Sequence, residues 1–372
     1  MYKLWKYANL LLFLLFPIKS SIIFLADKDG IGGNMDMIYN DNIHVGEYNT
    51  GHIQGIAIDK NREYMYCSFT TCFIKIDTNG NVVGSVKGLA GHLGCIAYNE
   101  DDGRVYGSLE FKHDKIGQDI LDNLETKKEV SDGFYIVIFD VEKIDRMDMD
   151  AEKDGIMTAV YLKEVLDDYK APGHRHGCSG IDGTTFAPLP GSPDSKKYLY
   201  VAYGIYTDLA RTDNDHQVIL RYDISNWKIY EHSLNQADMH TNGPASCDEK
   251  YFVYTGNTHY GIQNLEYDPV TNYMFAAVYR GRKPHFPNYP MYVIDMNSQG
   301  SCEKGSELYL AKVGNCDEET GIYGYDFPYG ATGIISLGDG TFYFSQNYKN
   351  ENGYGSNFKL YTYDVRKGFV EK

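Results

Sequence analysis

Basic side chains are fewer than acidic ones in the sequence, and no large cluster of them is present. It holds 35 lysines and arginines against 51 aspartates and glutamates, which gives a formal net charge of −16 at pH 7. A protein that binds the phosphate backbone of nucleic acid needs grouped lysines and arginines to neutralise phosphate charge. The acidic balance therefore excludes nucleic acid as an expected partner. The negative net charge also disfavours attachment to an anionic membrane surface.

Motifs of several common enzyme classes are absent as well. The chain contains no G-x-S-x-G elbow, no P-loop, and no dinucleotide-binding glycine motif between a strand and a helix. Long stretches with helical periodicity are scarce. Short apolar or alternating runs bounded by Gly, Asn and Asp dominate instead, a pattern that is typical of β-strands. We therefore expect an all-β protein.

Long apolar runs are confined to the first residues of the chain. Lys3 and Lys6 precede an apolar run over residues 10–16, and two serines follow it. This layout predicts a secretory signal peptide over residues 1–21, because the run is too short to span a bilayer. An uncleaved anchor is the alternative. We expect residues 22–372 to form a single secreted, extracellular domain, monomeric and without stable membrane association after cleavage.

The seven cysteines could form disulfides in a secreted protein. Cys67 and Cys72 lie across a short turn between two expected strands, and Cys302 and Cys316 enclose a short loop. We expect these two pairings as candidates, although Cα separation decides them. The odd number of cysteines leaves at least one free thiol.

A nearly repeated nonapeptide is the clearest sign of architecture. "GHIQGIAID" covers residues 51–59 and "GHLGCIAYN" covers residues 91–99. Further counterparts lie at residues 176–184, 260–268 and 329–337. Each is followed by a second β run and then by a third run that ends in aspartate, at Asp77, Asp140, Asp223, Asp295 and Asp364.

Four antiparallel strands in each radially repeated unit predict a β-propeller, with five blades. The fourth run follows the aspartate in most units, at residues 81–87, 158–165, 228–234 and 307–313. The fifth unit lacks one, and we expect residues 42–49 to supply it and to close the ring. Residues 250–257 form an extra run without a place in this scheme, so six or seven blades remain alternatives. Two insertions, residues 111–133 and 204–216, would emerge at one end of the propeller.

Two histidines mark the beginning of the first two innermost strands. His52 and His92 share one position of the repeat, where the other three units have glycine. Both imidazoles would then lie at the mouth of the central channel. A structural role, in which each histidine hydrogen-bonds to a neighbouring blade, is the alternative.

The ends of the second strands and the loops nearby point to the same mouth. They carry histidine, tyrosine and arginine, a set suited to proton transfer on an anionic substrate, because Arg binds carboxylates and His titrates near neutrality. We expect substrate-binding residues at His52, Glu110, Arg175, His176, Tyr203, Arg211, Gln263 and Arg280.

No motif predicts a cofactor. A divalent metal, catalytic or structural, is an alternative, with possible ligands at His52, His92, His113, His176 and Glu110. No close H-x-x-H or C-x-x-C spacing supports it. Residues 27–36 and 148–155 have part of the acidic spacing of a calcium loop, and we interpret them as acidic turns.

The spacing His92-x20-His113 resembles the histidine pair of the secreted β-propeller polysaccharide lyases of the ulvan and rhamnose–glucuronate types. The resemblance implies that His92 and His113 face the sugar ring and that Tyr206, or Tyr203, is the catalytic acid and base. It also implies that Arg211 or Arg175 binds the uronate carboxylate. His92, His113 and Tyr206 are then the expected catalytic residues.

The leading functional hypothesis is a lyase that cleaves an acidic, uronate-containing carbohydrate by β-elimination. A non-catalytic propeller that binds carbohydrate or protein is one alternative, and a metal-dependent hydrolase or lactonase is another. A glycosidase with two carboxylates on innermost strands is less favoured. Of the candidates Asp59, Asp182, Glu266 and Asp268, two lie near the far ends of their strands and the other two lack matched partners.

Overall fold

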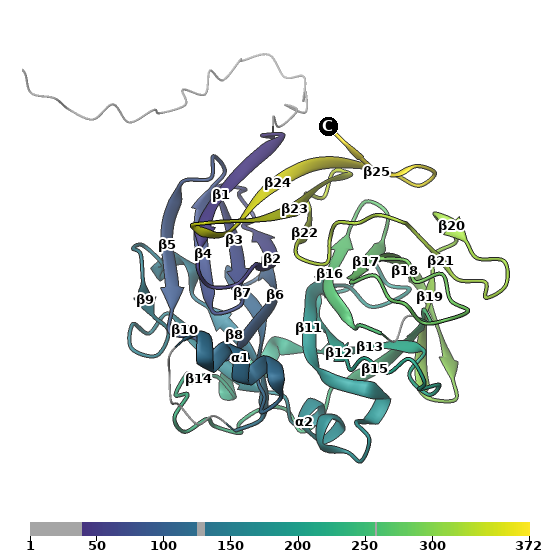
Figure 1. Cartoon of the computed structure of the whole chain (residues 1–372), viewed down its shortest axis with the longest axis horizontal. Helices are drawn as coiled ribbons and strands as arrows, with labels where there is room; N and C mark the ends of the chain where they lie inside the picture. Colours follow the sequence, from purple (N-terminus) through teal and green to yellow (C-terminus); the bar gives the residue numbers. More distant parts are fainter. Residues whose placement is uncertain (1–38, 125–130, 257–258) are drawn as a thin grey trace, which may run out of the picture. The chain divides into compact units, whose positions relative to one another are not determined.

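The computed structural model describes residues 39–124, 131–256 and 259–372. These residues form one compact unit, from Tyr39 to Lys372, whose regular secondary structure consists mostly of strands (Figure 1). Its α-helices are α1 (Lys115–Asn123) and α2 (Lys163–Lys170). The predicted signal peptide, residues 1–21, lies outside the described residues. No helix in the described ranges has the length and apolar character needed to cross a membrane.

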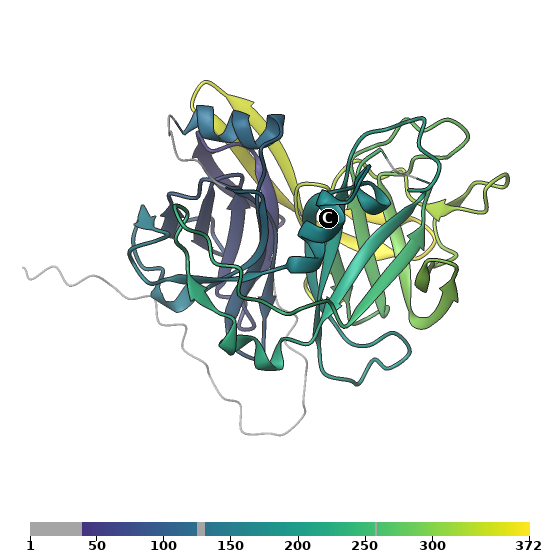
Figure 2. The ribbon, with the colours of Figure 1, turned by 90° about the horizontal axis from the view of Figure 1, so that it is seen from below.

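The innermost strands are the five runs that resemble the nonapeptide. Each lies against the next along the chain, and the last lies against the first; several of them run side by side in Figures 1 and 2. They are β2 (Ile53–Ile58), β6 (His92–Asn99), β11 (Cys178–Ala187), β16 (Ile262–Asp268) and β22 (Ile334–Ser336).

Further strands extend each innermost strand outward. The first sheet has the order β2, β3 (Tyr64–Phe69), β4 (Cys72–Asp77), β5 (Val82–Lys87), β9 (Met149–Asp150). The second has the order β6, β7 (Arg104–Phe111), β8 (Gly133–Phe139), β10 (Met157–Tyr161), β14 (His232–Ser233). The last has the order β22, β23 (Thr341–Asn350), β24 (Gly353–Asp364), β1 (Asn42–Tyr48), with β25 (Gly368–Glu371) also paired to β24. In these three sheets all strands are antiparallel to their neighbours except β9, which pairs with β5 in parallel.

The third and fourth repeats share one eight-stranded sheet. Its order is β11, β12 (Tyr198–Ile205), β13 (His216–Tyr222), β15 (Glu249–Tyr254), β19 (Gly305–Leu310), β18 (Met291–Cys302), β17 (Tyr273–Val278), β16. The two halves join where β15 and β19 pair in parallel. A separate small hairpin consists of β20 (Asn315–Cys316) and β21 (Tyr323–Gly324). The β-propeller class is confirmed, whereas the number of blades stays a prediction.

The strand expected to complete the last sheet does so. β1 pairs with β24 in antiparallel register, with Ile43 opposite Phe358. Ile43 and Val45 are buried, whereas Asn42 and His44 are exposed, the alternation of an outer strand with one covered face. The N-terminal and C-terminal parts of the described chain are thereby joined in one sheet.

One expectation about the outer strands is wrong. Residues 228–234 do not form the outer strand of the third repeat, because residues Ile224–Ile229 form a 3-10 helix that buries Trp227 and the chain then pairs with β10 of the preceding sheet. The unplaced run at residues 250–257 supplies that strand instead, as β15. The helical pattern expected in the insertion at residues 111–133 is confirmed by α1.

The predicted disulfides are also wrong, because all seven cysteines are free. In the β3–β4 hairpin Cys72 lies opposite Phe69, and Cys67 lies opposite Ile74. The two cysteines are therefore diagonal rather than directly opposed, a placement that holds their Cβ atoms too far apart for an S–S bond. Cys302 lies in β18 opposite Gly305, whereas Cys316 belongs to the small β20–β21 hairpin.

The propeller axis is bridged by a buried amide. Asn264 of β16 is fully buried; its Nδ2 donates to the backbone oxygens of Gln54 (2.8 Å) and Ala331 (3.0 Å). Its Oδ1 accepts from Cys95 Sγ at 3.4 Å. One side chain thus links three other parts of the ring.

We predict that Asn264→Ala lowers the free energy of unfolding by roughly 2–4 kcal/mol, because it removes the donor to one buried and one partly buried carbonyl oxygen, at about 1–3 kcal/mol for a buried one. Urea unfolding followed by circular dichroism measures the loss. The exposed Asn297→Ala is the matched control and is expected to change stability by less than about 0.5 kcal/mol. Equal stability of the two variants would contradict the bridging role.

Candidate functional site

The end of the propeller where the innermost strands begin, here called the leading end, brings together part of the predicted site. His92 is the first residue of β6, and it lies directly opposite Glu110 on β7. Asp182 comes from β11, within the irregular stretch between Ile181 and Thr184 of its pairing with β12. With Lys112 and Gln263, these residues form what we call the His92 cluster: His92, Glu110, Lys112, Asp182 and Gln263.

Glycine at position 180 lets Glu110 enter the cluster. Gly180 has a φ of +136°, and a Cβ atom there would lie 1.9 Å from Glu110 Oε2. That oxygen instead accepts a hydrogen bond from the backbone N–H of Ile181 at 3.1 Å. The local backbone of β11 is therefore shaped around the carboxyl group of the neighbouring sheet.

The cluster joins an imidazole to two carboxyl groups. His92 Nδ1 lies 3.8 Å from Glu110 Oε1 and 3.9 Å from Asp182 Oδ1, and it has no hydrogen-bond partner among the described residues. Lys112 Nζ lies 2.5 Å from Glu110 Oε1 and donates to the backbone oxygen of Ser179 at 3.1 Å. Gln263 Nε2 donates to Asp182 Oδ2 at 3.1 Å.

Burial sets the protonation of this cluster. It lowers the pKa of His92 to about 3, an effect to which the positive charge of Lys112 adds, so the imidazole is neutral at pH 7. Burial raises the pKa of Glu110 to about 7, although Lys112 acts in the opposite direction. Burial also raises the pKa of Asp182. Carboxyl groups with raised pKa values beside a neutral imidazole suit proton transfer near neutral pH.

His52 adjoins the cluster from the first repeat. Its Nε2 lies 3.1 Å from the hydroxyl of Tyr279 and 3.4 Å from Gln54 Nε2. The ring of Tyr279 contacts that of Tyr260 edge-on, with centroids 5.7 Å apart, and the ring of Tyr354 lies 6.3 Å from that of His52. The leading end therefore combines amide and imidazole groups with aromatic faces.

Tyr206 reaches the His92 cluster through one intermediate residue. Its hydroxyl donates to Asp114 Oδ2 at 3.0 Å, and the same oxygen lies 3.7 Å from Lys112 Nζ. Burial and the neighbouring Tyr169 and Asp114 raise the pKa of Tyr206. The predicted acid and base thus belongs to the same polar network but does not touch His92.

Other predicted residues point elsewhere. His113 has a 65% exposed side chain and contacts Asp132 at 2.9 Å. Tyr203 is fully buried and donates to Asp168, which also binds Arg175 at 2.7 Å. The structure therefore does not bring these three residues into contact with His92.

The remaining predicted cationic groups are likewise occupied. Arg211 pairs with Asp213 at 2.5 Å, and Arg280 pairs with Asp326. The ring of His176 packs edge-on against a buried phenylalanine, with centroids 5.0 Å apart. Every arginine expected to bind a uronate carboxylate is thus already held by an aspartate of the protein.

Three groups could hold a metal ion by their chemistry. Ligand atoms of His92, Glu110 and Asp182 lie within 4.8 Å of one another. His113 and His176, which the sequence offers as ligands, are not part of this group. The ammonium of Lys112 already contacts Glu110, and a second cation there would meet its repulsion. The cluster fits a cation poorly for this reason.

Two members of the cluster, Asp182 and Lys112, are not among the residues predicted to bind substrate or to catalyse; Asp182 is predicted only as a less favoured glycosidase carboxylate. Asp182 is visible as a charge within an otherwise apolar or small innermost strand, and Lys112 as a charge just beyond the second strand. Their partner, Glu110, comes from a different strand type. In the sequence, only carboxylates on innermost strands are compared with one another. Glu110 is therefore not found there as the partner of Asp182.

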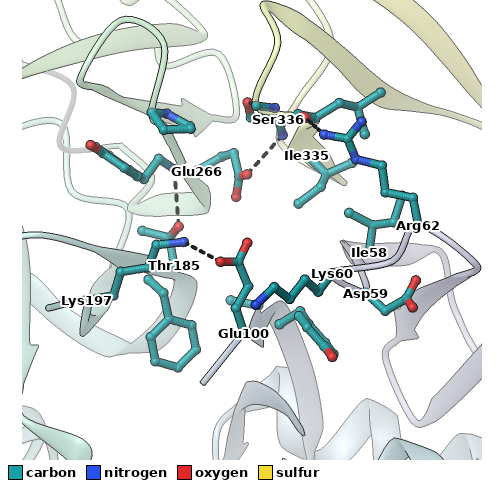
Figure 3. A pocket seen from close by; sticks show the side chains of 17 residues that line it. Ile58, Asp59, Lys60, Arg62, Glu100, Thr185, Lys197, Glu266, Ile335 and Ser336 are labelled. Atoms are coloured by element: carbon teal, nitrogen blue, oxygen red, sulfur yellow. Dashed lines mark hydrogen bonds and ion pairs between the residues drawn. The ribbon is translucent and has the colours of Figure 1, made fainter. Parts of the chain in front are cut away.

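The opposite, trailing end of the innermost strands contains a cavity of about 180 Å³. Residues from the ends of all five strands line it: Ile58, Ala97, Thr185, Phe186, Glu266, Tyr267, Ile335 and Ser336. In Figure 3 the side chains of Glu266 and Glu100 extend toward this cavity from different walls. Glu266 accepts a hydrogen bond from the backbone N–H of Ser336 at 2.9 Å, and burial raises its pKa to about 8.

Comparison with known proteins does not assign the chain to a family. No protein-family model matches the chain, and no curated protein matches its sequence. Among solved structures, the chain is similar to the Dos1 propeller, with a TM-score of 0.36, 11% identity, and 86% of this chain and 68% of that chain covered.

Two further solved structures are similar in the same way. A functionally unknown protein from Desulfotomaculum acetoxidans gives a TM-score of 0.35 at 12% identity and covers 88% of this chain and 80% of its own. The Cps50 (Swd1) β-propeller domain of Myceliophteria thermophila gives 0.29 at 9% identity and covers 86% and 99%. The similarity concerns the fold.

We predict that metal ions do not stabilise the protein. Because Lys112 already neutralises Glu110, dialysis against EDTA should leave the thermal midpoint unchanged, as should added CaCl₂, MnCl₂ or ZnCl₂. A metal bound at a hundred times its dissociation constant would add about 2.7 kcal/mol. A midpoint that falls with EDTA and recovers with one ion would contradict this prediction.

We predict that Glu266→Gln stabilises the protein progressively from pH 5 to pH 9. The folded state holds a proton on Glu266 up to pH about 8, whereas an unfolded glutamate loses it near pH 4.3. The contribution of Glu266 to stability is therefore lost as pH rises between these values, at about 1.4 kcal/mol per pKa unit. Urea unfolding at pH 5, 7 and 9 measures the difference.

The matched control for this measurement is Glu100→Gln, which changes an exposed carboxylate of the same cavity. Its effect should be small and should not grow with pH, because exposed ion pairs contribute about 0–1 kcal/mol. A stability difference for Glu266→Gln that stays constant with pH would show that Glu266 titrates normally.

Proposed function

We propose that the protein binds a carbohydrate at the leading end and hydrolyses it with the His92 cluster. The observation that carries this proposal is the convergence of His92, Glu110 and Asp182 within 4.8 Å, from three strands of two repeats. Amide and imidazole groups beside tyrosine faces supply hydrogen bonds and apolar contact, the two needs of a sugar ring.

The roles follow from burial. Asp182 and His92 keep 15% and 14% of their side chains exposed, whereas Glu110 keeps 4%. Asp182 and His92 are therefore the groups that touch substrate. Glu110 is a positioning residue behind His92, and Lys112 and Ile181 hold its two oxygens.

Proton transfer would pass through the imidazole. The proton of Glu110 moves to the unpartnered Nδ1 of His92, while the proton on Nε2 moves to the leaving glycosidic oxygen. The ionised Asp182 attacks the anomeric carbon as the bond to that oxygen breaks, and water later releases the sugar from Asp182 with the reverse proton movements.

The lyase hypothesis receives less support from the site. Elimination needs a group that neutralises the uronate carboxylate, and Arg175, Arg211 and Arg280 are each paired with an aspartate. This arrangement favours an uncharged sugar over the acidic carbohydrate expected from the sequence. Secretion and the monomeric state stay predictions.

The test incubates the purified protein with neutral and uronate-containing polysaccharides and follows reducing ends together with the ultraviolet absorbance of unsaturated uronates. Reducing ends without absorbance are the expected result. Absorbance that rises with reducing ends would establish elimination and overturn hydrolysis. If neither reducing ends nor absorbance appear, the non-catalytic binding propeller would be favoured.

Variants assign the roles. We expect His92→Ala and Asp182→Asn to lower turnover by about 10²–10⁴-fold with unchanged thermal unfolding, because each removes an acid, base or nucleophile. His113→Ala is the matched control and should keep wild-type turnover. Loss of turnover in His113→Ala would instead support the histidine pair of the lyase hypothesis.

A further inference from the structure

The cavity at the trailing end, here called the Glu266 cavity, lies at the opposite ends of the innermost strands from the His92 cluster. Its volume of about 180 Å³ has room for a small organic molecule rather than a single water. Its walls combine apolar side chains such as Ile58 and Ile335 with charged ones (Figure 3). The proposed function uses none of these residues.

Most charges around this cavity already have protein partners. Lys197 pairs with Glu100 at 3.2 Å, and Asp59 accepts two backbone N–H groups at 2.8 Å each. Arg62 donates to Tyr39 and to the backbone oxygen of Leu337. These groups are therefore held in place by the fold.

Glu266 differs from its neighbours. Its side chain lies in the wall with 9% of the residue exposed, and among the described residues it forms no ion pair. The backbone N–H of Ser336 is its hydrogen-bond donor, and the hydroxyl of Ser336 binds Asp268 instead. The Thr185 side chain also hydrogen-bonds to this carboxyl group. Both partners are neutral, and a carboxylate has about four acceptor sites, so capacity is left for a cation in the cavity.

We propose that the Glu266 cavity binds a small ligand through a primary ammonium group, which forms an ion pair with Glu266. A positively charged ligand suits this carboxylate best, because the neighbouring cations Lys197 and Arg62 already bind other groups of the protein. The exposed Lys60 lies among the residues of the cavity wall. An ammonium in the cavity would lie between the apolar walls and replace water there.

Binding of such a ligand is linked to a proton. The free carboxyl group is mostly protonated at pH 7, because burial raises the pKa of Glu266 to about 8. An ammonium favours the ionised form, so binding at pH 7 releases close to one proton. The charged groups around it are Asp59, Lys60, Arg62, Glu100, Lys197 and Asp268.

The test is isothermal titration calorimetry at pH 7 with cyclohexylamine and with its neutral analogue cyclohexanol. Titrations in PIPES and in HEPES, which contain no primary amine and differ in ionisation enthalpy, count the protons released. We expect the amine to bind at least tenfold more tightly than the alcohol and to release close to one proton. Its affinity should rise by up to tenfold per pH unit from pH 6 to pH 8.

Variants separate this site from the His92 cluster. Glu266→Gln should weaken amine binding at least tenfold and abolish proton release, and Glu100→Gln should do neither. Asp182→Asn should bind the amine as the wild type does, whatever becomes of the proposed hydrolysis. Equal binding of amine and alcohol, binding without proton release, or no binding of the amine at millimolar concentration would each overturn the proposal.

Discussion

The structure depends on hydrogen bonds to the backbone groups at the inner edges of its innermost strands. The backbone groups that face the axis have no further strand to pair with, so side chains must bind them. Ser68 donates to the backbone oxygen of Gly94, and Ser108 donates to that of Asp182, each at 2.7 Å and each across two neighbouring sheets. Asn264 completes the set at the centre. The same requirement fills the axis with polar side chains, and the candidate sites at its two ends extend from them.

Much of the fold could be predicted because the sequence motifs of the strands recur in the same order in each repeat. The doubled nonapeptide identifies β2 and β6, and the terminal aspartates identify the ends of the third strands. Where residues 228–234 and 250–257 compete for one position, sequence alone could not decide. Both runs have strand-like composition, and the outcome depends on Trp227 finding a buried site and on β15 pairing with the distant β19.

The site was predictable only where it lies on regular strands. His52, His92, Glu110 and Gln263 converge because their positions in the repeat place them at the same end. The arginines do not, since their partners Asp168, Asp213 and Asp326 come from a helix and loops whose course no repeat describes. His113 illustrates the limit of spacing: it lies three residues after Glu110, yet its ring turns to Asp132.

The parallel contact between β15 and β19 has a consequence for how the ring holds together. Outer strands of a propeller normally present free backbone groups, a template for pairing with another chain. Here the outer strands β15 and β19 pair with each other. The third and fourth repeats therefore have no free strand edge for a neighbouring molecule at that point. Hydrogen bonds that cross between the third and fourth repeats also couple them, so we expect these two repeats to open together rather than as independent segments.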